Sequence, residues 1–165
     1  MAAAGSDARM NGCELPVIIN SGSGNQGITA SVPVLVYAEE FKVDEDKKYR
    51  ALALSNLTAI HQKTPIGRLS AYCGAVSAGA GAGAGIAYLC GGGFKEVVHT
   101  VVKRPCHCVG HCLRRGKGFL CSQDCLGSGR REFWATTCIY AVSSFTGGDG
   151  IVTKGVEATL KNVGR

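Results

Sequence analysis

Residues 66–93, IGRLSAYCGAVSAGAGAGAGIAYLCGGG, decide the fold of this chain. From Leu69 to Cys90 there is no charged side chain, and alanine and glycine dominate. Glycine lowers helix propensity, so its repeated use within one helix is justified only where another backbone approaches closely. The stretch therefore predicts a central, buried helix over 68–89. Its length would also fit a membrane span, but Ala, Gly and Ser give too little transfer free energy to favour one.

Helical patterns flank this stretch on both sides. The remaining predicted helices are 28–41, 45–62, 94–102 and 153–163. Apart from the apolar run 15–20 there is little strand signal, so the predicted fold class is mainly α, built around the Ala/Gly-rich helix.

The helix predicted over 45–62 has the clearest signals. Asp44 is a plausible N-cap, and Thr64 with Pro65 should end the helix. Apolar spacing predicts that one face of it is buried, made of Tyr49, Leu52, Ala53, Leu57 and Ile60.

The segment just before helix 28–41 reads G-x-G-x-x-G, which is typical of dinucleotide-binding turns, and Asp44 lies at a distance that suits a ribose-binding acid. No second strand ends at that acid, however, which counts against a dinucleotide fold. A plain turn and a polar substrate loop, whose backbone N–H groups could hold a carboxylate, both remain open. The substrate-loop interpretation assigns binding to Ser21, Gly22, Ser23, Gly24, Asn25, Gln26 and Gly27.

Residues 105–125, PCHCVGHCLRRGKGFLCSQDC, hold five of the nine cysteines and two of the four histidines. Zinc binding is one interpretation, and the interleaved basic residues would fit a nucleic-acid-binding module. The spacing of the cysteines is not one of the usual paired zinc patterns. The window 103–131 contains seven Lys or Arg against the single Asp124, and so carries the whole net charge of +6.

Long motifs elsewhere closely resemble the L-cysteine desulfidase family, which is related to the alpha domain of iron–sulfur L-serine dehydratases. They are AAAGSDARMNGCELPVIINSGSGNQGITASVPV, KKYRALALSNLTAIHQKTPIGRLSAYCGAVSAGAGAGAGIAYLCGGG and GGDGIVTKGVE. The likeness covers 2–102 and 146–165. Members of the family are far longer, so the resemblance implies that 1–165 is a C-terminal portion of such a domain.

The resemblance also implies chemistry: a [4Fe–4S] cluster on three cysteines and β-elimination from a small amino acid, L-cysteine or L-serine. The first cluster ligand of the family pattern matches Cys73. The other two belong to a motif Cys-Asp-Gly-Ala-Lys-x-x-Cys, and its positions hold Leu113 and Leu120 here. With one ligand of three, this chain is not expected to assemble the cluster or to be active.

A one-base slip in the reading frame explains the missing motif. If Val-Cys-Asp-Gly-Ala-Lys-Ala-Ser-Cys-Ala is written with suitable codons and read one base early, it gives the nine residues 113–121 in order. We therefore interpret about 103–140 as an out-of-frame segment and expect 104–131 to be irregular. In this interpretation the apparent zinc site and the basic charge are by-products.

The family resemblance also implies the partners. We expect a small-molecule amino-acid substrate, no nucleic acid and no membrane, and the resemblance is compatible with a homo-oligomer. The start of the chain lacks a basic region followed by an apolar one, so no secretory signal is visible and a cytoplasmic location is expected.

Overall fold

The computed structural model describes residues 1–67, 74–102 and 155–163, and the regular elements within these ranges are helices. In chain order they are α1 (Ala2–Met10), α2 (Gly24–Glu40), α3 (Glu45–Ile66), α4 (Ala75–Leu89), an unlabelled helix over 94–102, and α8 (Val156–Val163). The prediction of a mainly α fold is confirmed. Within the described ranges, no helix combines the length and the apolar character that a membrane span requires.

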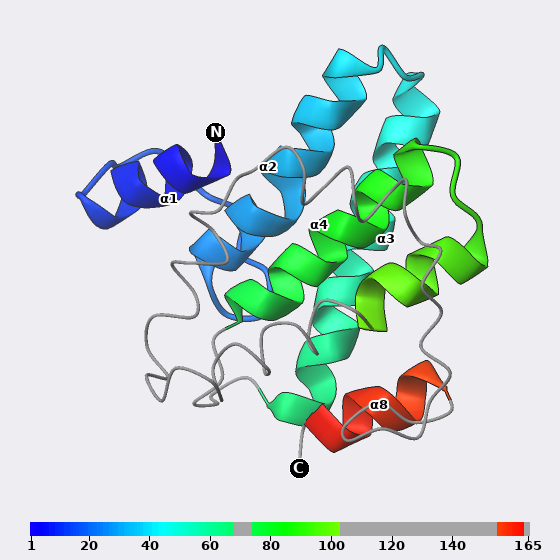
Figure 1. The fold of residues 1–165 in the computed structure, drawn as a ribbon. Coiled ribbons are helices and arrows are strands. Elements are labelled where there is room, and N and C mark those ends of the chain that lie inside the picture. The colour runs from blue at the N-terminus through cyan, green and yellow to red at the C-terminus, as the bar shows by residue number, and fades with distance from the viewer. Residues whose placement is uncertain (68–73, 103–154, 164–165) are drawn as a thin grey trace.

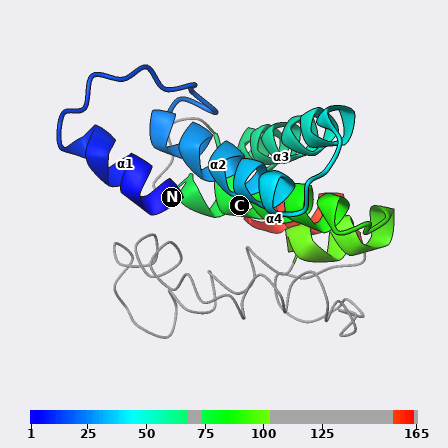
Figure 2. The same cartoon turned by 90° about the horizontal axis from the view of Figure 1, so that it is seen from above.

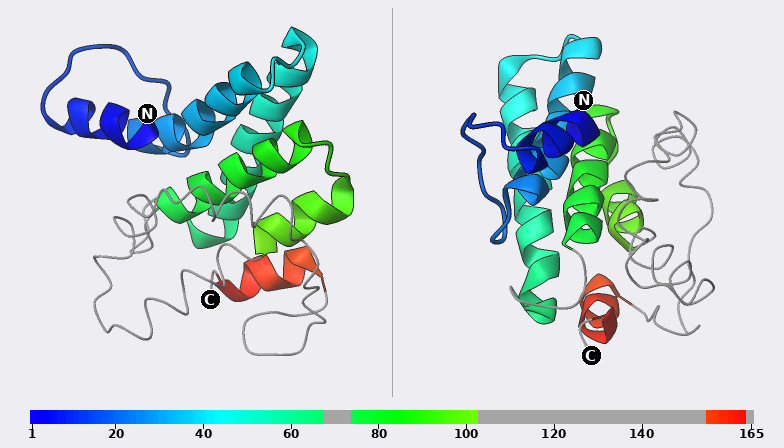
Figure 3. Two further views of the ribbon diagram at one scale, coloured as in Figure 1. Left: turned by 45° about the horizontal axis from the view of Figure 1, so that its top comes forward. Right: turned by 90° about the vertical axis from the view of Figure 1, so that its left-hand side faces the viewer.

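Helices α2, α3 and α4 form the core. Figure 1 shows α2 and α3 as an antiparallel pair joined at one end by a short connection, with α4 packed against both. The largest buried side chains of this core come from α2 and α4, and α3 contributes a small one. The cluster comprises Val34, Ala38, Ala51, Ala82, Ile86 and Leu89. Seen along the direction of Figure 3 (right), α4 lies between α3 and the helix over 94–102.

The contact between α3 and α4 depends on glycine. A β-carbon on Gly81 would lie 2.4 Å from the carbonyl oxygen of Ser55, and one on Gly85 would lie 3.0 Å from that of Ala51. Real β-carbons essentially never approach within 3.0 Å of such an atom. The two helices are therefore antiparallel and closer than any larger residue at Gly81 would permit, which is the reason for the Ala/Gly composition of α4.

The predicted buried face of α3 is wrong for most of its residues: of the five, only Leu52 is partly buried against the core cluster, and Ala53 is exposed. Tyr49, Leu57 and Ile60 are exposed, with 63%, 64% and 47% of their surface accessible. Buried instead are Ala51, Ser55, Ala59, Gln62 and Lys63. The physical reason is the glycine contact: α4 approaches so closely that only the narrow side of α3 fits against it, and Leu57 and Ile60 are left exposed.

Two helix ends also differ from the prediction. Helix α2 begins at Gly24 and not at residue 28, so four of the seven residues of the Gly-rich segment 21–27 are helical. Helix α3 continues through Pro65 to Ile66, because the backbone N–H of Gly67 still donates to the carbonyl of Lys63 (2.9 Å) and closes the last turn. Asp44 is the N-cap residue as predicted, although its side chain makes no capping hydrogen bond.

If 103–140 is out of frame, the helix that should cover the Ala/Gly-rich helix is missing, and one apolar face of the latter should be partly uncovered; this expectation is wrong for its described part. Ala78, Ala80, Ala82 and Ala84 are fully buried, as is Ile86. The side chain of alanine is a single methyl group, so such a helix has little apolar surface that needs covering. The first predicted residues of this helix, 68–73, lie outside the described residues, and so does the segment 104–131 that was expected to be irregular.

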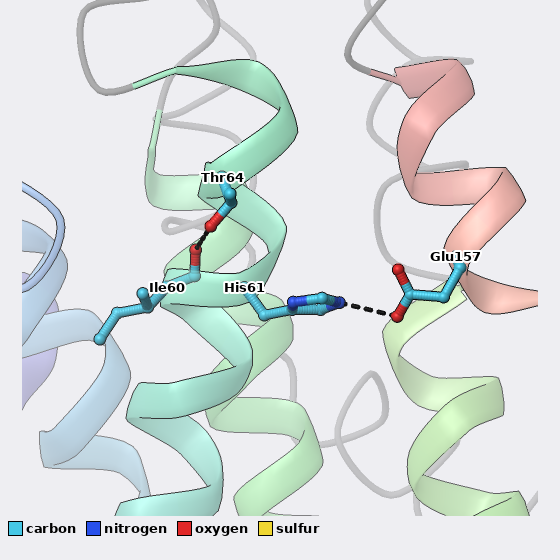
Figure 4. A network of polar contacts seen from close by, with 4 residues as sticks. All are labelled: Ile60, His61, Thr64 and Glu157. Carbon is cyan, nitrogen blue, oxygen red and sulfur yellow. Dashed lines mark hydrogen bonds and ion pairs between the residues drawn. The ribbon is translucent and has the colours of Figure 1, made fainter.

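Helix α8 packs against the last turns of α3. An ion pair joins them, with Nε2 of His61 2.8 Å from Oε1 of Glu157. Figure 4 shows that His61 leaves α3 toward α8, whereas Ile60 points to the opposite side of the helix. The C-terminal helix thus lies on one flank of α3 and leaves the other flank free of α8.

Candidate functional site

The Gly-rich segment opens with a tight turn. Asn20 and Ser23 exchange two backbone hydrogen bonds, each of 3.2 Å, across Ser21 and Gly22. Both central residues have positive φ, 51° at Ser21 and 92° at Gly22. Glycine adopts this conformation without strain, whereas serine does so at a cost. The turn reverses the direction of the chain, and α2 starts at Gly24, directly after Ser23.

Two glycines of the segment serve close packing. A β-carbon on Gly27 would lie 1.9 Å from the carbonyl oxygen of Ile18, and one on Gly24 would lie 2.9 Å from Nε of Arg9. A dinucleotide-binding fold requires one strand before the glycine-rich turn and a second strand that ends at the acidic residue. Residues 15–19 form no strand, and Asp44 is the N-cap of α3, so neither strand is present at these positions. The G-x-G-x-x-G spacing here instead lets residues 17–18 lie directly on the first turn of α2.

Ser21 is committed to the turn. Its hydroxyl donates to Oδ1 of Asn20 (2.9 Å), and Nδ2 of Asn20 donates to Oδ1 of Asn56 on α3 (2.8 Å). Asn56 in turn donates to the carbonyl of Leu52 (2.9 Å). Asn20 is only 4% exposed, so this chain of hydrogen bonds anchors the Gly-rich segment to α3 from within. Ser21 is therefore better suited to holding the loop than to touching a ligand.

Gln26 lies at the junction between two helices. Its side-chain amide fills the space beside Gly74, where a β-carbon would fall 2.1 Å from Nε2 and 2.5 Å from Oε1. Gly74 is the N-cap residue of α4, and it follows Cys73 directly in the sequence. Cys73 itself lies outside the described residues. The structure thus brings one predicted binding residue, Gln26, to the residue next to the predicted cluster ligand.

Arg9 contacts the candidate site, and the sequence did not reveal this. Its Nη1 donates to Oδ1 of Asn25 at 2.9 Å, which ties α1 to the start of α2. The guanidinium thereby adds a cation beside the N-terminus of α2, where the free backbone N–H groups already favour an anion. No sequence motif links Arg9 to a segment that follows it by 16 positions, so only the fold could show this contact.

The described residues contain no group of three or more His, Cys, Asp or Glu side chains that could hold a metal ion. The cysteines described there, Cys13 and Cys90, are free and exposed. This part of the chain therefore does not fit an iron–sulfur cluster by itself. The Cys- and His-rich stretch 105–125, predicted by one interpretation to bind zinc, lies outside the described residues.

Comparison with known proteins gives a family and several relatives. The family model described as "Serine dehydratase alpha chain" matches residues 1–111. The UPF0597 protein DSY1109 of Desulfitobacterium hafniense is 54% identical over 168 residues, which cover 99% of this chain and 38% of that protein. A UPF0597 protein of Lachnoclostridium phytofermentans is 49% identical over 163 residues, covering 99% of this chain and 39% of the relative.

A third relative, a UPF0597 protein of Oleidesulfovibrio alaskensis, is 52% identical over 101 residues, or 61% of this chain. The chain spans less than two fifths of the length of the curated relatives named above. No solved structure matches it.

Proposed function

The chain belongs to the serine dehydratase alpha chain family, and we propose on that basis that it is part of an amino-acid β-lyase acting on L-cysteine. The reaction would convert L-cysteine and water into pyruvate, ammonia and sulfide. One observation supports the placement of the site: the amide of Gln26 lies against Gly74, next to Cys73 in the sequence.

The residues around that contact suit the binding of an α-amino acid. Arg9 and the backbone N–H groups of the first turn of α2 favour a carboxylate, because the guanidinium supplies positive charge and a helix N-terminus supplies donors. The amide of Gln26 has both a donor and an acceptor, so it could orient a polar substituent of the substrate. We propose Gln26 and Arg9 as the binding residues, with Gly22, Ser23, Gly24, Asn25 and Gly27 shaping the loop and Ser21 holding it.

The family resemblance supports a [4Fe–4S] cluster in the complete enzyme, where an open iron would act as a Lewis acid on the substrate. Cys73 is the matching ligand in this chain, and leucines stand at the two other positions, Leu113 and Leu120. We therefore propose that this polypeptide binds substrate without turning it over. Its out-of-frame segment, 103–140, would account for the loss.

Anaerobic iron–sulfur reconstitution tests the cluster proposal. The protein should retain no stoichiometric four-iron cluster after desalting and should release no sulfide from L-cysteine. Assembly of a complete cluster on this sequence would contradict it. Metal analysis of the purified protein covers the alternative: one equivalent of zinc, lost with chelator, would favour a zinc or nucleic-acid module at 105–125. Translation of the coding DNA in three frames tests the slip directly.

Ligand-observed NMR tests the binding proposal. L-cysteine should show saturation transfer from the wild-type protein, and Gln26→Leu should abolish most of it. Asn11→Leu is the matched control, because Asn11 is an exposed amide residue that hydrogen-bonds only locally, to the carbonyl of Asp7. Equal transfer in both variants would exclude Gln26 as a binding residue.

A further inference from the structure

An exposed aliphatic surface lies beside the anchored Gly-rich segment. It consists of Ile18, Ile19, Leu57 and Ile60, which are 83%, 68%, 64% and 47% exposed. Ile19 precedes Asn20, and Leu57 follows Asn56, so the hydrogen bond between those two asparagines (2.8 Å) holds the two segments that carry these side chains next to each other. We call these four residues the aliphatic face. Figure 2 shows that the segment carrying Ile18 and Ile19 runs along the same side of the fold as α3.

The aliphatic face is unlike an ordinary solvated surface. Residues 51–62 of α3 contain no Asp, Glu, Lys or Arg, and neither do residues 15–38. The outer face of a helix in a soluble protein normally carries such charges, whereas clustered large aliphatic side chains mark interaction sites. The ion pairs of α3, Glu45 with Lys48 and Asp46 with Arg50, lie in its first turns and outside this face.

The backbone beneath the aliphatic face is fixed. The carbonyl oxygen of Ile18 packs so closely against Gly27 that a β-carbon there would lie 1.9 Å from it. Asn20 is buried, and its side chain is hydrogen-bonded to that of Asn56. A preformed apolar surface loses little conformational entropy on association, so it favours binding. The side chains are therefore presented on a rigid support and not on a loose loop.

We propose that the aliphatic face is covered, in the complete protein, by the part of the polypeptide that the longer relatives have and this sequence lacks. More than half of each relative lies outside the region that matches this chain: the match takes 38% of the Desulfitobacterium hafniense protein and 39% of the Lachnoclostridium phytofermentans protein. Neighbouring parts of one chain bury surface against each other, and clusters of exposed apolar side chains mark the places where such contacts form. The aliphatic face offers that contact, because α4 and α8 occupy other sides of α3. This inference is independent of the proposed substrate and cluster.

Co-expression tests the proposal. This chain would be produced together with the part of the Desulfitobacterium hafniense relative that lies outside the matched region, and co-purification would show whether a complex forms. The two partners would then be purified separately, and their affinity would be measured by titration calorimetry. We expect a one-to-one complex. Leu57→Lys with Ile60→Lys should weaken it by at least about tenfold, because two charges would be buried in an apolar contact.

Two comparisons complete the design. Phe41→Lys is the matched control: Phe41 is 48% exposed, much as Ile60 is, but it follows the last residue of α2 and lies at the end of α3 opposite to Ile60, so this variant should bind like the wild type. Ile18→Ser with Ile19→Ser changes the other half of the face and should weaken the complex without any change to α3. Circular dichroism of each variant alone shows whether it is folded.

Three results would overturn the proposal. One is the failure of the wild-type chain to form a complex. Another is equal affinity for the wild type and for both double variants. The third is a wild-type dimer, detected by light scattering, that Leu57→Lys converts to a monomer; this would mean that a second copy of the chain covers the face.

Discussion

The side-chain amide of Gln26 occupies the space that a β-carbon on Gly74 would need, with Nε2 2.1 Å from that position. The contact joins the first turn of α2 to the residue that caps α4. Both partners are required for it: a glycine that leaves room and a long amide side chain that fills it.

Gly74→Ala should displace Gln26 at a small cost in stability. The obstructing atoms are the far end of a flexible side chain, which can turn to another rotamer. We expect the free energy of unfolding in urea to change by less than about 1 kcal/mol. The side-chain amide resonances of Gln26 should nevertheless shift, and L-cysteine binding should fall. Unchanged Gln26 resonances would show that the amide does not lie against Gly74.

Gly27→Ala should be much more damaging. Its β-carbon would lie 1.9 Å from the backbone oxygen of Ile18, and no side-chain rotation can relieve that clash. Residues 15–20 would have to move away from α2, so we expect a loss of about 3 kcal/mol, at the upper end for overpacking. Gly5→Ala is the control, because its β-carbon would meet only Cγ2 of Ile28 at an ordinary 3.5 Å. Similar urea midpoints for the two variants would contradict the packing described above.

Asn20→Ala should release the Gly-rich segment from α3. The change removes the donor to Oδ1 of Asn56 and the acceptor of the Ser21 hydroxyl, within a site that is almost fully buried. Leaving such groups unpaired costs about 1–3 kcal/mol. Hydrogen exchange should become faster at the backbone N–H of Ser23, which is bonded to Asn20 across the turn. Protection as strong as in the wild type would mean that the turn holds itself.

Glu157→Gln should have little effect. The ion pair of His61 with Glu157 has side chains that are 56% and 71% exposed, and water screens such pairs. We expect the thermal midpoint to fall by no more than the equivalent of about 1 kcal/mol. A larger loss would show that this pair, and not apolar packing of α8 through residues such as Leu160, holds the last helix in place.

Except for α1, which was not predicted, the existence and type of the described helices could be predicted from the sequence, but the orientation of α3 could not. The apolar spacing of Tyr49, Leu57 and Ile60 is typical of a buried face, yet that face is exposed. Spacing alone does not reveal the size of the partner. Since α4 presents glycine to α3, the two backbones lie close together, and the residues of α3 at the contact are the small ones, Ala51 and Ser55.

The candidate site could be predicted in part for a similar reason. The polar and glycine composition of 21–27 pointed to a binding segment, and the structure places one of its members, Gln26, beside Gly74. The start of α2 at Gly24 was missed, because glycines usually signal a loop and not a helix. Arg9 was missed because its contact with Asn25 depends on the path of the chain between them.

The glycine-dependent contact between α3 and α4 also has a consequence for the order of folding. Each interior glycine lowers intrinsic helix stability by about 1 kcal/mol relative to alanine, and α4 has glycine at 79, 81, 83 and 85. An isolated segment of that composition is mostly unstructured, whereas α3 has alanine and leucine in its interior. We therefore expect α4 to acquire its structure as it docks, with α3 as the surface on which it forms. Substitutions at the α3–α4 contact should accordingly slow refolding as well as speed unfolding.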